Sequence, residues 1–151
     1  MEEGDCRLLW EWANDPLVRA HAFSSAPIPW EEHLEWFKRK QVDPNCTFYI
    51  LMDSEGRPAG QVRFDRQPDG GAEIDISLAS HQRGRGIGTQ ALMLACESFL
   101  ESRKGRRVVG FIKPENIASI RIFEKAGFSR QGKRQVEGHE AVSMSLELEK
   151  T

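Results

Sequence analysis

Two hydrophobic periods run along this chain and divide it into expected helices and strands. Apolar residues recur every three or four positions in some segments, which is the period of an amphipathic helix. In others they alternate with polar residues, which is the period of a strand with one buried face. We expect helices over residues 5–13, 30–40, 91–104 and 117–126, with one helical turn after Pro16. We expect strands over residues 46–52, 58–64, 73–78, 108–112, 128–136 and 141–148.

A glycine-rich turn joins the third expected strand to the helix that follows it. Gly84, Gly86 and Gly88 are interleaved there with two arginines, Arg83 and Arg85. Such a turn exposes backbone N–H groups beside the positive end of the helix dipole, where an anion is stabilised. Because the arginines add positive charge, the segment predicts a pyrophosphate site. The alternative is an ordinary strand–helix turn that binds nothing.

The spacing of the glycines and of the residues that follow them distinguishes the known types of pyrophosphate-binding loop. A dinucleotide fold needs G-x-G-x-x-G and an acidic residue about 20 positions later, whereas these glycines run G-x-G-x-G. A triphosphate loop needs a Lys-Ser or Lys-Thr pair, and none follows the glycines. The remaining pattern, R-x-x-G-x-G over residues 83–88, resembles the coenzyme A loop of the GNAT superfamily of N-acetyltransferases. A second motif, N-x-x-S-x-x-I-F-x-x-x-G-F over residues 116–128, is similar to a helix of the same family.

The resemblance to the GNAT family implies the fold. It implies one acetyltransferase domain over residues 1–151, of the α/β (α+β) class. A mixed, mostly antiparallel sheet would be flanked by helices and would splay between the fourth and fifth family strands. The family normally begins with a strand before its first helix, and this chain starts almost at the helix. Either that edge strand is lost, or the start is trimmed, or the domain was cut from a larger polypeptide.

The resemblance also assigns the contacts of acetyl-coenzyme A, the expected co-substrate. Pantetheine would pair with the backbone of the strand before the glycines, and the loop N–H groups would take the pyrophosphate. Asn116 and Ser119 would face the pantetheine arm, and Phe123 would face the thioester. The expected coenzyme contacts are Ser77, Leu78, Ala79, Arg83, Gly84, Arg85, Gly86, Ile87, Gly88, Thr89, Asn116, Ser119 and Phe123.

Direct acetyl transfer to an amine needs a base, because alkyl ammonium groups have a pKa of about 10. Glu73 and Asp75 are two positions apart on an expected central strand, so both face one way, and we predict that they are the catalytic carboxylates. The alternative is a solvated strand face. Many family members carry a tyrosine, as the acid for the leaving thiolate, where this chain has Phe123. Since a thiol with a pKa of about 8.5 is a fair leaving group, activity does not require that hydroxyl.

The N-terminal third is expected to bind the acceptor. Its motifs W-x-N-D-P-x-V-R and E-E-H-x-x-W-F resemble those of N-acetyltransferases of pseudaminic-acid and surface-polysaccharide pathways. Those enzymes act on amino-sugar nucleotides. Arginine suits a diphosphate and aromatic rings suit stacking, so the candidate acceptor contacts are Arg19, His33, Trp36 and Arg63. Tryptophans at helical spacing also suit a core. Two other functions stay open: acetylation of a protein N-terminus, as in ribosomal-protein acetyltransferases, and a coenzyme A-binding module without turnover.

Composition excludes several other functions. The net charge is −2 with both signs mixed, so we expect neither nucleic acid nor a membrane as a partner. Cys6, Cys46 and Cys96 lack C-x-x-C spacing, which indicates reduced thiols in a cytoplasmic protein. The four histidines show no metal-ligand spacing, so no metal is expected. The oligomeric state stays open, with a homodimer among the alternatives.

Overall fold

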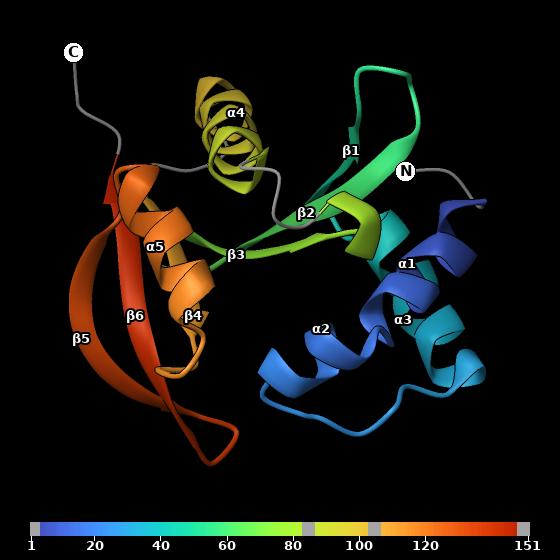
Figure 1. Ribbon diagram of the computed structural model, residues 1–151, viewed down its shortest axis with the longest axis horizontal. Coiled ribbons are helices and arrows are strands. Elements are labelled where there is room, and N and C mark those ends of the chain that lie inside the picture. Colours follow the sequence, from blue (N-terminus) through green and yellow to red (C-terminus); the bar gives the residue numbers. More distant parts are fainter. Residues whose placement is uncertain (1–3, 83–86, 103–106, 148–151) are drawn as a thin grey trace.

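A computed structural model describes residues 4–82, 87–102 and 107–147 (Figure 1). Six strands form one sheet in the order β1-β2-β3-β4-β6-β5. The strands are β1 (Cys46–Met52), β2 (Pro58–Arg66), β3 (Gly71–Leu78), β4 (Arg107–Ile112), β5 (Ser129–Val136) and β6 (His139–Glu147). The helices are α1 (Asp5–Ala13), α2 (Pro16–His21), α3 (Trp30–Val42), the short η1 (Ser80–Gln82), α4 (Ile87–Glu101) and α5 (Ile117–Lys125). The expected α/β class with a mostly antiparallel sheet is confirmed.

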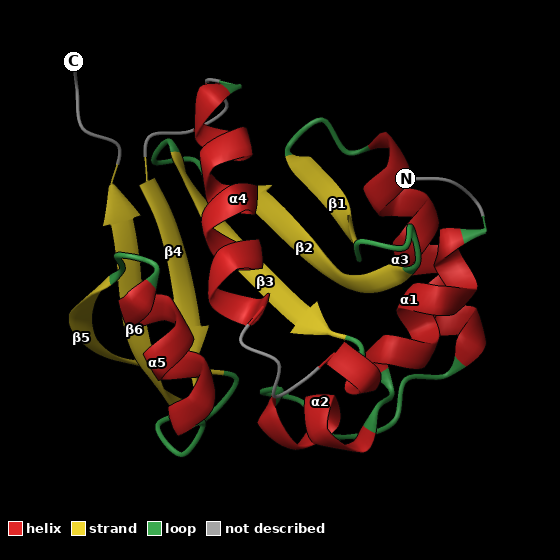
Figure 2. Cartoon of the chain, turned by 45° about the horizontal axis from the view of Figure 1, so that its top comes forward, coloured by secondary structure: helices red, strands yellow, loops and turns green. Residues whose placement is uncertain are grey.

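The sheet splays between β3 and β4. These two strands form the parallel pair of the sheet, and their register covers only Gly71–Glu73 against 107–109. Beyond Glu73 the strands diverge, as the turned view in Figure 2 shows. In the part of the chain that the structure describes, no strand precedes α1, so β3 and β4 correspond to the fourth and fifth family strands. One edge of β3 from Ile74 to Leu78 therefore keeps backbone groups that β4 does not use.

The helices cover the two faces of the sheet in separate groups (Figures 1 and 2). α4 and α5 pack on one face, where the rings of Phe64 and Phe99 stack with their centroids 4.2 Å apart. α1 and α3 pack on the other face against Phe48 and Ile50 of β1. Because side chains alternate along a strand, β1 contributes Tyr49 and Leu51 to the first core and Phe48 and Ile50 to the second. Burial of each large apolar side chain contributes about 1.5–3 kcal/mol.

The strand and helix types agree with the periodicities, and the main difference lies at the start of α4. This helix begins at Ile87, four residues before the expected position 91. Gly88 is buried there, and a Cβ at this position would lie 3.0 Å from the Cδ1 atom of Ile122. Close packing therefore selects glycine inside a helix, although glycine is a poor helix former. That residue masked the beginning of the helix in the sequence pattern.

The Asn14-Asp15-Pro16 segment connects α1 and α2 by hydrogen bonds to the segment that precedes α3. The side chain of Asn14 donates to the carbonyl of Ile28 at 3.1 Å and accepts from its N–H at 2.7 Å. Asp15 caps α2 by accepting from the N–H of Leu17 at 3.0 Å, and Pro16 is the first residue of the helix. These contacts hold α2 beside the splayed end of the sheet.

Candidate active site

A cavity of about 860 Å³ runs along β3 at the splay. Its walls come from α1, α2 and α3 on one side and from α4, β4 and α5 on the other. The unpaired edge of β3 passes between the two sides. Each half therefore has its own set of side chains, and both open onto the same strand.

The half beside α4 and α5 contains most of the expected coenzyme contacts that the structure describes. The lining includes Ser77, Leu78, Ile87, Gly88, Thr89, Asn116, Ser119 and Phe123. Ala79 lies outside the lining, and its N–H already donates to the carbonyl of Ala59 at 2.8 Å. Arg83, Gly84, Arg85 and Gly86 lie outside the described residues.

Asn116 and Phe123 set the shape of this half. The Oδ1 atom of Asn116 accepts from the N–H of Ser119 at 3.3 Å, so Asn116 caps the start of α5. Phe123 is buried and its ring meets Phe128 edge-on at a centroid distance of 4.8 Å. A Cβ on Gly110 of β4 would lie 2.8 Å from the Cε1 atom of Phe123. Glycine at position 110 therefore allows the ring to lie against the strand.

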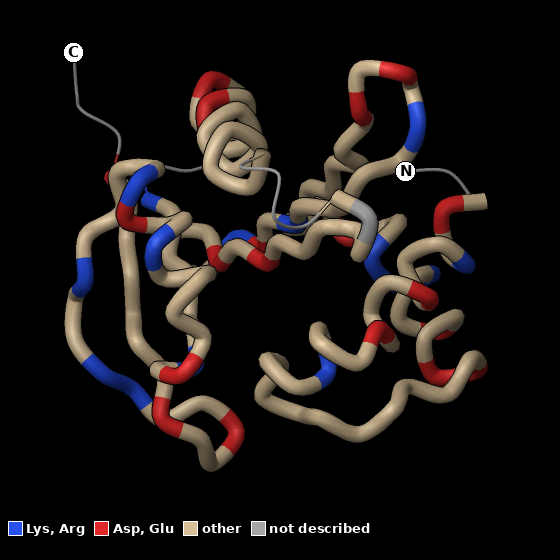
Figure 3. The backbone as a smooth tube through the Cα atoms, viewed as in Figure 1, with Lys and Arg blue, Asp and Glu red and all other residues tan. Residues whose placement is uncertain are grey.

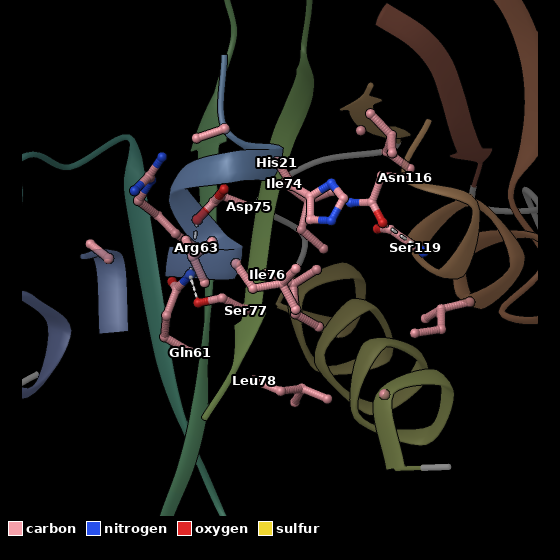
Figure 4. A pocket seen from close by; sticks show the side chains of 18 of the residues that line it. His21, Gln61, Arg63, Ile74, Asp75, Ile76, Ser77, Leu78, Asn116 and Ser119 are labelled. Carbon is pink, nitrogen blue, oxygen red and sulfur yellow. Dashed lines mark hydrogen bonds between the residues drawn. The ribbon is translucent and has the colours of Figure 1, made fainter. Parts of the chain in front are cut away.

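Across β2 and β3, polar side chains face the N-terminal helices. Gln61 lies opposite Ser77, and Arg63 lies opposite Asp75. The Nε2 atom of Gln61 donates to Asp75 Oδ2 at 2.9 Å and to Ser77 Oγ at 3.1 Å (Figure 4). Because a carboxylate only accepts hydrogen bonds, the amide nitrogen must face Asp75. The Oε1 atom of Gln61 is then buried without a partner, so the site holds an unused acceptor.

The two predicted catalytic carboxylates differ in position. Both are exposed, but Asp75 lines the cavity and Glu73 lies outside its lining. Glu73 shares a strand face with Asp75 and lies opposite Asp65 of β2. Partial desolvation by the surrounding protein, followed by the like charges of Asp65 and Asp75, raises the pKa of Glu73 above its usual value.

Arg63 carries the positive charge on this face. Its Nε atom donates to Asp65 Oδ2 at 2.8 Å, and its guanidinium lies over the ring of Trp36, 5.2 Å from the centroid. Lys40 donates to the other oxygen of Asp65 at 2.7 Å. Burial alone would lower the pKa of Arg63, but the charges of Asp75 and Asp65 more than offset it, so the pKa is raised. Both signs of charge thus meet on the central strands (Figure 3).

Two other expected acceptor contacts, Arg19 and His33, also line the cavity but are engaged in holding the fold. Arg19 donates from Nε to the carbonyl of Ala13 at 2.6 Å and from a terminal nitrogen to the carbonyl of Ser24 at 2.8 Å. Burial lowers the pKa of Arg19, with the charge of Asp75 acting against it. The Nε2 atom of His33 lies 2.9 Å from the carbonyl oxygen of Cys6. Burial lowers the pKa of His33 and this hydrogen bond opposes the shift.

Gln61 and His21 are polar residues of the cavity lining that the sequence patterns did not single out. Gln61 faces the same way as Asp75 because it is paired with Ser77, and only the register between strands reveals this. His21 is the last residue of α2, and no spacing rule marks it. Within the described ranges, no group of three or more His, Cys, Asp or Glu is placed to hold a metal ion. No described helix is long and apolar enough to cross a membrane.

Known proteins with similar sequences include several acetyltransferases. Aminoglycoside N(6')-acetyltransferase type 1 of Klebsiella pneumoniae is 27% identical, over 87% of this chain and 73% of that protein. An uncharacterised protein of Methanocaldococcus jannaschii is 25% identical over 87% of this chain. The chain spans 27% of the length of that archaeal protein and 66% of a probable N-acetyltransferase of Bacillus subtilis.

Solved structures share the fold. An aminoglycoside acetyltransferase in complex with coenzyme A and kanamycin has a TM-score of 0.84 and 25% identity, over 97% of this chain and 91% of that one. Spermidine N-acetyltransferase from Vibrio cholerae, in complex with coenzyme A and spermine, has a TM-score of 0.86 at 17% identity, over 97% and 92%. The coenzyme in these complexes agrees with the expected co-substrate. Residues 1–129 match the acetyltransferase (GNAT) domain family, so the chain belongs to this family of acyltransferases, as its motifs predicted.

Proposed function

We propose that the chain transfers an acetyl group from acetyl-coenzyme A to the primary amine of an amino-sugar nucleotide, by direct attack in a ternary complex. The observation that carries the proposal is one continuous cavity with two different halves on either side of β3. One half is lined by the start of α4 and by α5, and the other by the N-terminal helices. A donor and an acceptor bound in these halves would meet at the unpaired edge of β3.

The coenzyme half fits its ligand physically. Unpaired backbone groups of β3 beyond Glu73 suit the amides of pantetheine, which can pair with them as a short strand would. The first turn of α4 presents backbone N–H groups that suit a pyrophosphate. Residues 83–86, the remainder of the predicted loop, lie outside the described residues. Bound acetyl-coenzyme A would supply the thioester carbonyl that the amine attacks.

Asp75 is our candidate for the group that takes the proton of the amine. It lines the cavity and is oriented by Gln61, whereas Glu73 lies outside the lining. The buried Oε1 atom of Gln61 offers a further acceptor to an N–H or O–H group of the substrate. Backbone N–H groups near Ser77 and Leu78 are the candidates for stabilising the oxyanion.

The charges around the cavity favour an acceptor that carries an anion. Among the described lining residues, the acceptor half has two cationic side chains, Arg19 and Arg63, and one carboxylate, Asp75, whereas Arg121 and Lys125 lie on α5 in the coenzyme half. Kanamycin and spermine, bound by the structural neighbours, each carry several amino groups. Two guanidinium groups against one lining carboxylate favour a diphosphate over such polycations. The stacked guanidinium of Arg63 suits this group best.

A transfer assay tests the proposal. The purified chain is mixed with acetyl-coenzyme A and, in turn, UDP-glucosamine, kanamycin, spermidine or a peptide with a free N-terminus. Thiol release measures the rate, and mass spectrometry identifies the acetylated product. We expect a kcat/KM at least about tenfold higher for the nucleotide sugar, since an ion pair of a few kcal/mol exceeds the 1.4 kcal/mol that a factor of ten needs. Preference for kanamycin, spermidine or the peptide would overturn the acceptor class, and coenzyme binding without any transfer would overturn the enzyme.

Arg63→Lys probes the same acceptor contact. Lysine keeps the charge beside Asp65 but loses the planar fork, so KM for the nucleotide sugar should rise while the affinity for coenzyme A stays the same. Arg130→Lys is the matched control, because Arg130 is exposed, pairs with Glu124 at 3.3 Å and does not line the cavity. Equal effects of the two substitutions would remove Arg63 from the acceptor site.

A further inference from the structure

Acetyl transfer releases the thiolate of coenzyme A in the half of the cavity beside α5, and this thiolate must be protonated. When an amine displaces the thioester, the C–S bond breaks and its electron pair stays on sulfur. A thiol has a pKa of about 8.5, so a group that titrates below that value can return the proton as the bond breaks. The aromatic ring on α5 that faces this region, Phe123, has no proton to give.

His21 is the residue of the described lining that suits this task. It lies at the end of α2, and it lines the same cavity as Asn116 and Ser119, which Figure 4 labels with it. The Nδ1 atom of His21 is buried and has no hydrogen-bond partner. A buried polar atom without a partner is unfavourable, and a ligand group at this position would supply the missing hydrogen bond.

Contacts of the neighbouring residues fix the position of the backbone at His21. Lys113, which follows β4, is buried and donates from Nζ to the carbonyl of Ala20 at 3.3 Å, one residue before His21. This bond ties the end of α2 to the end of β4, across the splay. At the other end of α2, Asp15 caps the helix. The backbone that carries His21 is therefore fixed at both ends of α2.

The other titratable groups of the lining suit the task less well. His33 is buried with its Nε2 atom 2.9 Å from the carbonyl of Cys6, and its ring lies between Trp30 and Trp36. Arg121 and Lys125 present a guanidinium and an ammonium, which suit the phosphates of the coenzyme rather than its sulfur. An imidazole, in contrast, exchanges its proton near neutral pH.

We propose that His21 is a catalytic residue that donates the proton on its Nδ1 atom to the departing thiolate of coenzyme A. The proposal rests on the acetyl transfer proposed above. The amine nitrogen forms a bond to the carbonyl carbon, the C–S bond breaks, and the sulfur takes the imidazolium proton to give the free thiol. The surplus proton of the amine passes to Asp75 or its water and returns through solvent to the imidazole, so the charges balance.

Nitrogen NMR tests the contact without any acceptor. The wild-type chain with labelled histidine is titrated with coenzyme A and, separately, with desulfo-coenzyme A, and His21→Gln assigns the signal. We expect both ligands to bind, and only coenzyme A to shift the Nδ1 resonance of His21 strongly. The same shift with both ligands, or none with either bound, would overturn the proposal. If neither ligand binds the wild-type chain, the proposed function itself fails.

Kinetics test the role. His21→Gln should lower kcat about 100-fold, the lower end of the range for a positioned acid, with KM for acetyl-coenzyme A nearly unchanged. Adding Phe123→Tyr to this variant should restore part of kcat, because a phenol then reaches the same region. His139→Gln is the matched control, an exposed histidine at the start of β6. An unchanged kcat in folded His21→Gln, with wild-type transfer intact, would overturn this inference and leave the proposed function standing.

Discussion

Replacement of Asp65 by asparagine tests how the charges on the acceptor face are held together. Asp65 accepts from Lys40 at 2.7 Å and from Arg63 at 2.8 Å, and all three side chains are about one quarter exposed or less (22–23%). Asparagine keeps the shape but turns one acceptor into a donor that faces a cation. We therefore expect one charge-assisted hydrogen bond to be lost and the other weakened.

The magnitude follows from the exposure of the pair. A hydrogen bond to a charged group contributes about 1.5–3 kcal/mol, and partial access of water to this site reduces that value. We expect Asp65→Asn to lower the free energy of unfolding by about 2 kcal/mol at pH 7, which corresponds to a fall in Tm of about 4–8 °C in a domain of this size. Urea and thermal unfolding, followed by circular dichroism, measure both quantities.

The same variant has a defined pH dependence. Burial acts to raise the pKa of Asp65, but the hydrogen bonds and charges of Lys40 and Arg63 outweigh it and hold the pKa below its usual value. A lowered pKa in the folded state means that the contribution is present above the unfolded value, near 3.9, and is lost as the pH falls through the folded value. The difference between wild type and Asp65→Asn should therefore be constant from pH 7 to pH 5 and shrink below about pH 4.

A control and a refuting result are available. Glu124→Gln breaks an ion pair with Arg130 whose side chains are 49% and 58% exposed, so it should cost less than about 0.5 kcal/mol. If Asp65→Asn costs no more than this control, or if its cost is the same at pH 3 as at pH 7, the Lys40–Asp65–Arg63 network does not stabilise the fold in the way that its geometry indicates.

Three further predictions concern packing, reactivity and catalysis. Gly60→Ala would bring a Cβ to 2.5 Å from a backbone oxygen of β3, so it should lower the free energy of unfolding by about 1–3 kcal/mol and weaken coenzyme A binding in calorimetry. Gly4→Ala, which has open space around it, should change neither quantity. Burial raises the pKa of Cys96 to about 12, so a disulfide reagent at pH 8 should label it only after unfolding. Asp75→Asn should lower kcat more than Glu73→Gln does; the reverse order in a transfer assay would reassign the base.

The wall of the cavity beside α4 and α5 could be predicted from the sequence because its signals are local. The residues 87–89 follow one another at the start of α4, and Asn116, Ser119 and Phe123 follow one another along α5. Backbone N–H groups at a helix start, and side chains three or four positions apart on a helix, are placed by the local conformation alone. A motif of a dozen residues therefore describes one wall of the cavity.

The acceptor side depended on contacts between distant segments. The candidates Arg19 and His33 do line the cavity, but their donors and acceptors are occupied by the carbonyls of Ala13, Ser24 and Cys6. No residue type predicts which of its possible partners a side chain will meet.

The sequence by itself determined most of the secondary structure and the family, because periodicity and short motifs are properties of neighbouring residues. Only the tertiary structure decided which polar groups share the cavity. The register of β2 against β3 places Gln61 beside Asp75, and the contact of α2 with the end of β4 brings His21 into the same cavity as Asn116. In both cases a buried polar atom without a partner results, and such atoms exist only after distant segments have packed.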